Sequence, residues 1–167
     1  MPEKRPHLDE PGPRGDEREL LLGWLAFHRD ALVRNCADVA PEQLIEASVP
    51  PSDLTLLGLL RHLTEMEHWY FIALLSGEDP GPLYCPDDNE DGDILGLDVS
   101  MVEPSMTAWR EHTARADGLI AEYSLDDLTP SGTRTVRWVV LKMLEEYARH
   151  NGHADLIRER IDGAVGE

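Results

Sequence analysis

Apolar side chains recur at intervals of three and four residues along four stretches of the chain, which is the spacing of an amphipathic helix. In the first stretch, residues 16–40, the recurring positions are Leu21, Trp24, Leu25, His28, Leu32 and Cys36. The same spacing predicts further helices at about residues 54–76, 103–123 and 136–162. We expect Pro41 to end the first helix, Ser52 or Asp53 to cap the second, and Gly163 to end the fourth.

Turn-forming residues fill the connection between the second and third predicted helices. Residues 77–102 contain three prolines, four glycines and an acidic cluster from Asp87 to Asp93, so we expect a long surface connection that begins at Gly77. No segment shows the alternation of a strand. Four helices with one long crossover predict an all-α fold, a four-helix bundle formed by residues 16–165. Residues 1–15 hold four prolines and two glycines and are predicted to be a mobile tail.

Polar residues interrupt the apolar stripes of two predicted helices. The stripe of the fourth helix consists of Val136, Val139, Met143, Glu146, His150, His153 and Ile157. The stripe of the second helix consists of Leu59, His62, Met66, Trp69 and Ala73. An inward-facing carboxylate is costly unless it is paired, hydrogen-bonded or bound to a metal, so these polar groups should need one another.

His62, Glu146 and His150 form a candidate metal site. Glu146 and His150 are four residues apart, so their side chains emerge on one helix face about 5–6 Å apart. With His62 they offer two imidazoles and one carboxylate, which suits a catalytic zinc site or the facial triad of iron or another divalent metal. The alternative is a buried ion pair in which His62 neutralises Glu146. Gly58 and Gly152 lie within these helices, where we expect a neighbouring backbone or a ligand to approach closely.

Two blocks of the chain carry a resemblance to a known superfamily. They are LLGLLRHLTEMEHWYF, residues 56–71, and WVVLKMLEEYARHNGHADLIRERIDG, residues 138–163. In order, spacing and flanking residues they resemble the DinB-like superfamily of four-helix metalloproteins, which includes the mycothiol-dependent maleylpyruvate isomerases. The closer likeness is to the uncharacterised actinobacterial branch of mini-circle proteins, and it spans about residues 16–165.

The resemblance implies which residues bind the metal. In such proteins the second helix supplies one ligand and the fourth supplies two, at i and i+4, which places them at His62, Glu146 and His150. Zinc is the expected metal, and nickel, iron and manganese also tolerate this ligand set. Many members have glutamine where this chain has His153, so we expect His153 to lie beside the metal or to face the substrate, and the alternative is that it is itself a ligand. His153 or a bound water would accept the thiol proton.

The resemblance also implies a reaction. Family members of known activity mostly join or transfer a low-molecular-weight thiol, which is mycothiol in actinobacteria. The implied function is a metal-dependent transferase that uses mycothiol and a small electrophile, with Arg61 and Arg149 as candidates to hold a substrate carboxylate. The isomerase activity is not carried over, because that enzyme needs a second domain that 167 residues do not accommodate. The competing interpretation is a non-catalytic stress protein that binds a metal or a small molecule.

The composition and charge of the chain limit the kinds of partner that we expect it to bind. The chain has 33 acidic and 15 basic residues, and its net charge of −18 disfavours nucleic acid and anionic membrane surfaces as partners. No apolar run approaches the roughly 18 residues of a membrane span, and no signal peptide stands out, so we expect a cytoplasmic protein. Cys36 and Cys85 form no metal-type spacing and are expected to be reduced thiols. Homodimers are common among such bundles, although no interface stands out in the sequence.

The acidic segment 87–98 has the spacing of a calcium loop. Asp87, Asn89, Asp91, Gly92, Asp93, Ile94 and Asp98 fall on the positions of an EF-hand pattern. The pattern ends in aspartate instead of glutamate, and nearby prolines forbid the entering helix, so a solvated loop is favoured over a calcium site. Such a loop could also cover the metal pocket as a lid. His68 and His112 lie beside charged neighbours and are expected to be exposed, whereas His28 is expected to pack in the core.

Overall fold

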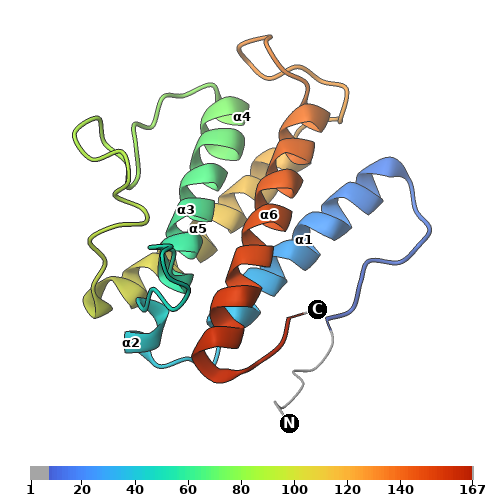
Figure 1. Ribbon diagram of the computed structural model, residues 1–167. Helices are drawn as coiled ribbons and strands as arrows, with labels where there is room; N and C mark the ends of the chain where they lie inside the picture. Colours follow the sequence, from blue (N-terminus) through green and yellow to red (C-terminus); the bar gives the residue numbers. More distant parts are fainter. Residues whose placement is uncertain (1–7, 167) are drawn as a thin grey trace.

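The computed structural model describes residues 8–166, and this part of the chain is built from helices and connecting loops without a strand (Figure 1). An isolated bridge between Leu128 and Thr135 joins the two ends of the loop before the last helix. The prediction of an all-α fold is therefore confirmed. Residues 1–7 of the predicted tail lie outside the described residues, and Pro11, further along it, lies against Gly23 of the first helix.

Helix α1, Glu17–Cys36, begins where the sequence predicts and ends early. Asp16 and Glu19 form a capping box, in which each carboxylate accepts the backbone N–H of the other residue. The helix ends at Cys36, and Asp38 follows with a positive φ of 56°. Pro41 does not end this helix. It occupies the first turn of the short helix α2, Pro41–Leu44, where its missing N–H costs nothing.

The second predicted helix is one continuous rod with three labelled parts: α3, Leu56–Glu67, the π-helical segment η1, His68–Ala73, and α4, Leu74–Ser76. The expected caps Ser52 and Asp53 are wrong, because Thr55 accepts the N–H of Gly58 at 2.9 Å. Gly77 ends the rod in the left-handed conformation, with φ 74°.

The last two long helices follow two irregular connections. A 3-10 turn, η2 (Val99–Met101), leads into α5, Val102–Ala121. Helix α6 spans Val136–Asp162 as predicted, between the N-cap Thr135 and Gly163, whose φ is 77°. No described helix combines the length and the hydrophobicity that crossing a bilayer requires.

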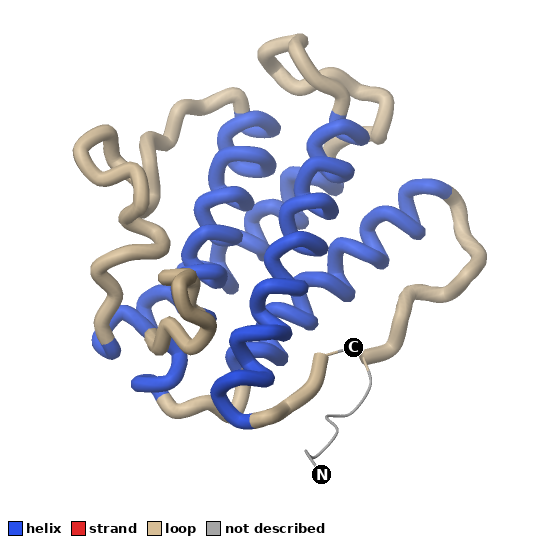
Figure 2. Tube along the Cα trace, viewed as in Figure 1, coloured by secondary structure: helices blue, strands red, loops and turns tan. Residues whose placement is uncertain are grey.

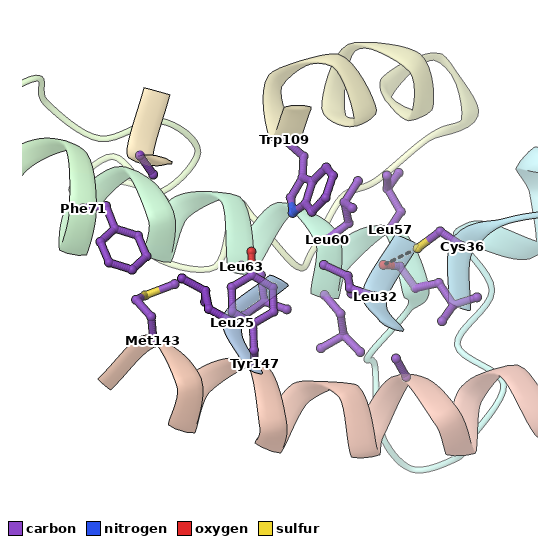
Figure 3. Packing of buried hydrophobic residues seen from close by; sticks show 14 of the residues in the cluster. Leu25, Leu32, Cys36, Leu57, Leu60, Leu63, Phe71, Trp109, Met143 and Tyr147 are labelled. Carbon is purple, nitrogen blue, oxygen red and sulfur yellow. Dashed lines mark hydrogen bonds between the residues drawn. The ribbon is translucent and has the colours of Figure 1, made fainter. Parts of the chain in front are cut away.

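The long helices surround a single core. Helix α1 packs on α6, and α3 packs on both α5 and α6 (Figures 1 and 2). The connection of residues 77–98 runs along the side of α3. Leucines of α1 and α3 meet Trp109 of α5 and Met143 and Tyr147 of α6 in the core (Figure 3).

The buried stripe of α6 differs from the predicted one. The predicted positions are buried from Val136 to Glu146, but His150 and His153 are only half-buried. Beyond Glu146 the predicted Ile157 is buried, and the other buried positions are Tyr147, Asn151, Ala154 and Arg158. The two histidines therefore lie at the boundary between core and solvent.

An ion pair in the core was not predicted. Arg29 of α1 donates to both carboxylate oxygens of Glu67 at 2.8 Å, and the hydroxyl of Tyr147 donates to the same carboxylate at 2.8 Å. Glu67 is fully buried. Burial alone would lower the pKa of Arg29, but the charge and hydrogen bond of Glu67 outweigh it and raise the pKa above the ordinary value. This network joins α1, α3 and α6.

Candidate metal centre

Three predicted ligands converge on one point between α3 and α6. His62 comes from α3, and Glu146 and His150 come from α6. Each offers one ligand atom, and these atoms all lie within 4.8 Å of one another. Glu146 is buried, whereas the two histidines are half-buried. The structure thus brings together the residues that the sequence predicts, at the edge of the core.

The carboxylate of Glu146 is held by cations. It accepts hydrogen bonds from Lys142 and, at 3.0 Å, from Arg149, and one of its oxygens lies 3.4 Å from Nε2 of His150. The carboxylate in contact with His62 is that of Asp93, at 2.8 Å from Nδ1. The alternative pairing of His62 with Glu146 is therefore not the arrangement found. The predicted substrate-binding residue Arg149 lies beside the site.

Asp93 orients His62 from outside the group. Its carboxylate lies 2.8 Å from Nδ1 of His62 and is almost completely buried. A carboxylate at this distance requires a proton on Nδ1, and in the neutral ring this leaves the lone pair on Nε2. Burial alone would raise the pKa of Asp93, but the hydrogen bond and charge of His62 outweigh it and lower the pKa below the ordinary value. The sequence places Asp93 only in the calcium pattern, so this role was missed.

The connection that carries Asp93 is fixed on α3 by a buried carboxylate. Glu65 accepts the backbone N–H groups of Leu83 at 3.1 Å and Tyr84 at 2.6 Å, and the indole N–H of Trp69 at 2.8 Å. Sequence reasoning missed Glu65, because nothing near it in the sequence identifies its partners. It holds the connection 77–98 close to the candidate ligands.

Arg61 also fastens this connection. Its guanidinium donates to the carbonyl of Gly92 at 2.9 Å and to the hydroxyl of Ser105 at 3.2 Å, and it lies over the ring of Tyr84 at 3.8 Å. Its role in substrate binding stays a prediction, and the contacts seen are structural ones.

The surroundings of Gly58 and Gly152, where a close neighbour was expected, differ. A Cβ on Gly58 would lie 3.4 Å from the backbone of Ile94, so the expected close approach is confirmed there. A Cβ on Gly152 would meet nothing within 4 Å, so no described backbone approaches it closely, and the approach of a ligand there stays a prediction.

Two positions of the calcium pattern are committed to other contacts. Asp93 faces His62, and Asp98 caps η2 by accepting the N–H of Ser100 at 2.7 Å. Cys85 lies beside this part of the connection and hydrogen-bonds Asp93. Burial, together with the charge of Asp93, raises the pKa of Cys85 to about 11, so its thiol is protonated near neutral pH. Segment 87–98 therefore lies against the candidate metal centre, which it contacts through Asp93.

His150 has the properties of a neutral imidazole ligand. Burial first, and then the charge of His62, lowers the pKa of His150 to about 4, against the opposing charge of Glu146. Its ring lies 4.6 Å from that of His62 and 5.4 Å from that of His153, measured between centroids. The Nδ1 atoms of His150 and His153 are 3.4 Å apart. His153 thus adjoins the group, and its role in proton transfer stays a prediction.

The prediction that His68 is exposed is wrong. It is buried, with Nε2 2.8 Å from the carbonyl of Gly81 and Nδ1 3.2 Å from Nε2 of His112. His112 is half-buried, and its Nδ1 lies 2.7 Å from the carbonyl of Ala108. These contacts tie the start of the connection to α5. The charged sequence neighbours face elsewhere, so they were a poor guide to the exposure of either ring.

Comparison with known proteins identifies the family. The family model of mycothiol-S-transferase (MST) matches residues 20–163, which is most of the chain. The chain belongs to the mycothiol-S-transferase family. This MST family is DinB-like, so the resemblance to the DinB-like superfamily is confirmed. No curated protein and no solved structure matches the chain.

Proposed function

We propose that this MST-family chain is a metal-dependent transferase that joins mycothiol to an electrophilic small molecule. The observation that carries the proposal is the convergence of His62, Glu146 and His150, with Asp93 behind His62, in a member of this family. The proposal includes the four-helix bundle of the DinB-like proteins as its scaffold. A cytoplasmic location and a homodimer remain predictions.

The donor atoms fit a divalent metal. Two imidazoles and a carboxylate leave coordination positions open, as catalytic zinc sites and facial-triad sites do. The contact between Asp93 and His62 is the carboxylate–histidine arrangement that commonly stands behind a metal-binding imidazole. Zinc is the proposed ion, and nickel, iron or manganese also suit these donors.

Each part of the site has a separate task in the proposed reaction. When bound, a divalent ion lowers the pKa of a coordinated thiol so that it ionises near neutral pH. His153 accepts the thiol proton, and Arg149 beside Glu146 attracts an anionic group of a substrate. The sulfur then forms a bond to the electrophilic carbon, and the leaving group departs with the electrons of the broken bond.

Elemental analysis of untagged protein tests the metal. We expect about one divalent ion per chain, lost in a His150→Ala variant and retained in a His112→Ala control, since His112 lies outside the group. The metal-loaded protein should then consume mycothiol in the presence of an alkylating electrophile, and His150→Ala should not. Absence of metal after reconstitution with both zinc and nickel overturns the proposal.

A second candidate is a non-catalytic binding protein. It is favoured by the contacts of Lys142 and Arg149 with Glu146, because these cations neutralise the carboxylate without a metal ion. This candidate predicts stoichiometric binding of a small molecule or metal without thiol consumption. Multiple turnovers per chain in the same assay exclude it.

A further inference from the structure

A cleft of about 480 Å³ opens beside the π-helical segment and includes none of the three candidate ligands. The residues that give it its chemistry are Trp69, Tyr70, Ala73, Leu74, Pro130 and Arg134. Its volume is within the range of small-molecule pockets, about 300–1,000 Å³, which are mostly apolar with a few placed polar groups. π-Helical turns are rare and are frequent at functional sites. These features indicate a ligand site.

The cleft is lined by η1, α4 and two loops, and Tyr70 in its lining also contacts α6, the helix that carries Glu146 and His150. His62 of α3 meets His150 of α6, and further along the rod Tyr70 meets Trp138 at 6.2 Å between ring centroids. From residue 62 to residue 70 is about 12 Å along a helix. An elongated ligand of that length would reach from the cleft to the metal ligands.

One wall of the cleft is held in place before any ligand arrives. The indole N–H of Trp69 donates to the buried carboxylate of Glu65, which is itself fixed by backbone N–H groups of the connection. The polar atom of Trp69 is therefore already satisfied. What the ring adds to the cleft is apolar surface, which favours an apolar ligand body.

Arg134 supplies the positive charge in the lining of the cleft, beside the acids Glu78 and Asp79. Arg134 is the only cation among the described residues that line it, and the guanidinium lies 4.9 Å from the centre of the Trp138 ring. Its hydrogen bond is to the neutral hydroxyl of Thr133, at 3.4 Å. No described carboxylate is paired with Arg134, so its charge is available to a carboxylate of the ligand.

The two acids at the rim are engaged elsewhere. Glu78 lies 3.6 Å from Arg115, and Asp79 accepts the backbone N–H of Gly81 at 3.1 Å. Both belong to the start of the connection, and neither is paired with Arg134.

We propose that this cleft binds the electrophilic co-substrate, and that the co-substrate is an elongated amphipathic carboxylate. Its carboxylate pairs with Arg134, its apolar body lies along Trp69 and Ala73, and its reactive carbon extends toward His62. The role in turnover rests on the proposed function, whereas binding in the cleft does not. In turnover, the thiol sulfur bonds to the reactive carbon, the leaving group departs with the electron pair of the broken bond, and the thiol proton passes to His153.

Binding is tested first, on metal-free protein, by calorimetry with decanoate and with decan-1-ol. An extended chain of about ten carbon atoms matches the ~12 Å span. We expect Arg134→Gln to lower the affinity for decanoate about tenfold and to leave the affinity for decan-1-ol unchanged, because only decanoate has a charge that pairs with Arg134. Ala73→Trp should weaken both ligands by filling the cleft. Arg110→Gln, which removes an exposed charge from α5, should weaken neither.

Turnover is tested next, on metal-loaded protein with mycothiol and ω-bromo carboxylic acids, from which bromide is displaced. Arg134→Gln should lower kcat/KM about tenfold for 10-bromodecanoate and leave 3-bromopropanoate unchanged, since the short acid cannot span both sites. Decanoate binding that depends on Arg134 supports the cleft even if no metal binds. Equal binding of decanoate to the parent chain and to Arg134→Gln overturns the proposal, as does a dimer in sedimentation experiments that Ala73→Trp dissociates.

Discussion

The contact between Asp93 and His62 makes a quantitative prediction about metal affinity. Asp93 is 4% exposed, and its carboxylate is the partner of His62 Nδ1 at 2.8 Å. Removal of such a partner typically costs about 10- to 100-fold in metal affinity, which is about 1.4 to 2.7 kcal/mol. We expect Asp93→Ala to lie near the upper end, because it removes the acceptor and the charge from a buried site.

The variant Asp93→Asn separates the two contributions. Its amide oxygen can still accept from Nδ1, so the tautomer of His62 is retained while the negative charge is lost. We expect a loss of about three- to tenfold, at or below the lower end of the range for outer partners of a metal site. Zinc affinity is measured by competition with a chromophoric chelator at fixed pH and salt concentration.

A matched control lies in the same connection. Asp91→Ala removes an exposed carboxylate two residues away and should change zinc affinity by less than twofold. Circular dichroism establishes that each variant is folded. If Asp93→Ala binds zinc as tightly as the parent chain, His62 does not bind the ion through Nε2 under the direction of Asp93, and the reasoning is refuted.

Three further predictions concern the core, the pH dependence and the charge of the site. Arg29→Met should lower the free energy of unfolding by about 3–5 kcal/mol in urea titrations, because it leaves the buried carboxylate of Glu67 without its cation; a loss below 1 kcal/mol would contradict this. The free energy of unfolding of the metal-free protein should fall by about 2 kcal/mol between pH 7.5 and 5. Unfolded His150, with its ordinary pKa of 6.5, binds a proton in this range that folded His150, with a pKa of about 4, does not bind. The loss should shrink by that amount in His150→Gln, and an unchanged pH slope would exclude His150 as its source. Lys142→Gln should raise zinc affinity about fivefold at low salt by removing a cation beside Glu146, and a gain that persists in 1 M salt would point to another cause.

The helix ends show what local sequence determines. Helix α6 has the predicted bounds because Thr135 and Gly163 act within a few residues of the helix that they delimit. The start of α3 was predicted wrongly at Ser52 or Asp53, which rank above the actual cap, Thr55, as capping residues. The choice among three neighbouring caps follows from the burial of Leu56 directly after Thr55, and burial is decided by the fold.

The residues of the site also divide into those that local sequence predicts and those that depend on the fold. His62, Glu146 and His150 could be predicted because each lies on a helix whose period is visible in the sequence. Asp93 could not, because it is 31 residues from His62, and its position depends on the path of an irregular connection. Glu65 fixes that path through backbone N–H groups, which any residue except proline supplies, so no pattern of side chains reveals it.

The position of the site at the edge of the core separates stability from metal binding. On α6, Tyr147 is fully buried and donates to Glu67, whereas its neighbour Glu146 faces His62 and His150. Tyr147→Phe should therefore lower the free energy of unfolding by about 1.5–3 kcal/mol, the value of a hydrogen bond to a charged group, and leave zinc affinity within twofold. Asp93→Asn should instead lower zinc affinity and have little effect on the free energy of unfolding. Since the two sites share no partner, the double variant should show both effects additively, within about 0.5 kcal/mol for unfolding. A larger interaction energy would mean that the core network and the metal centre are coupled through α6, and that the separation argued from their burial is wrong.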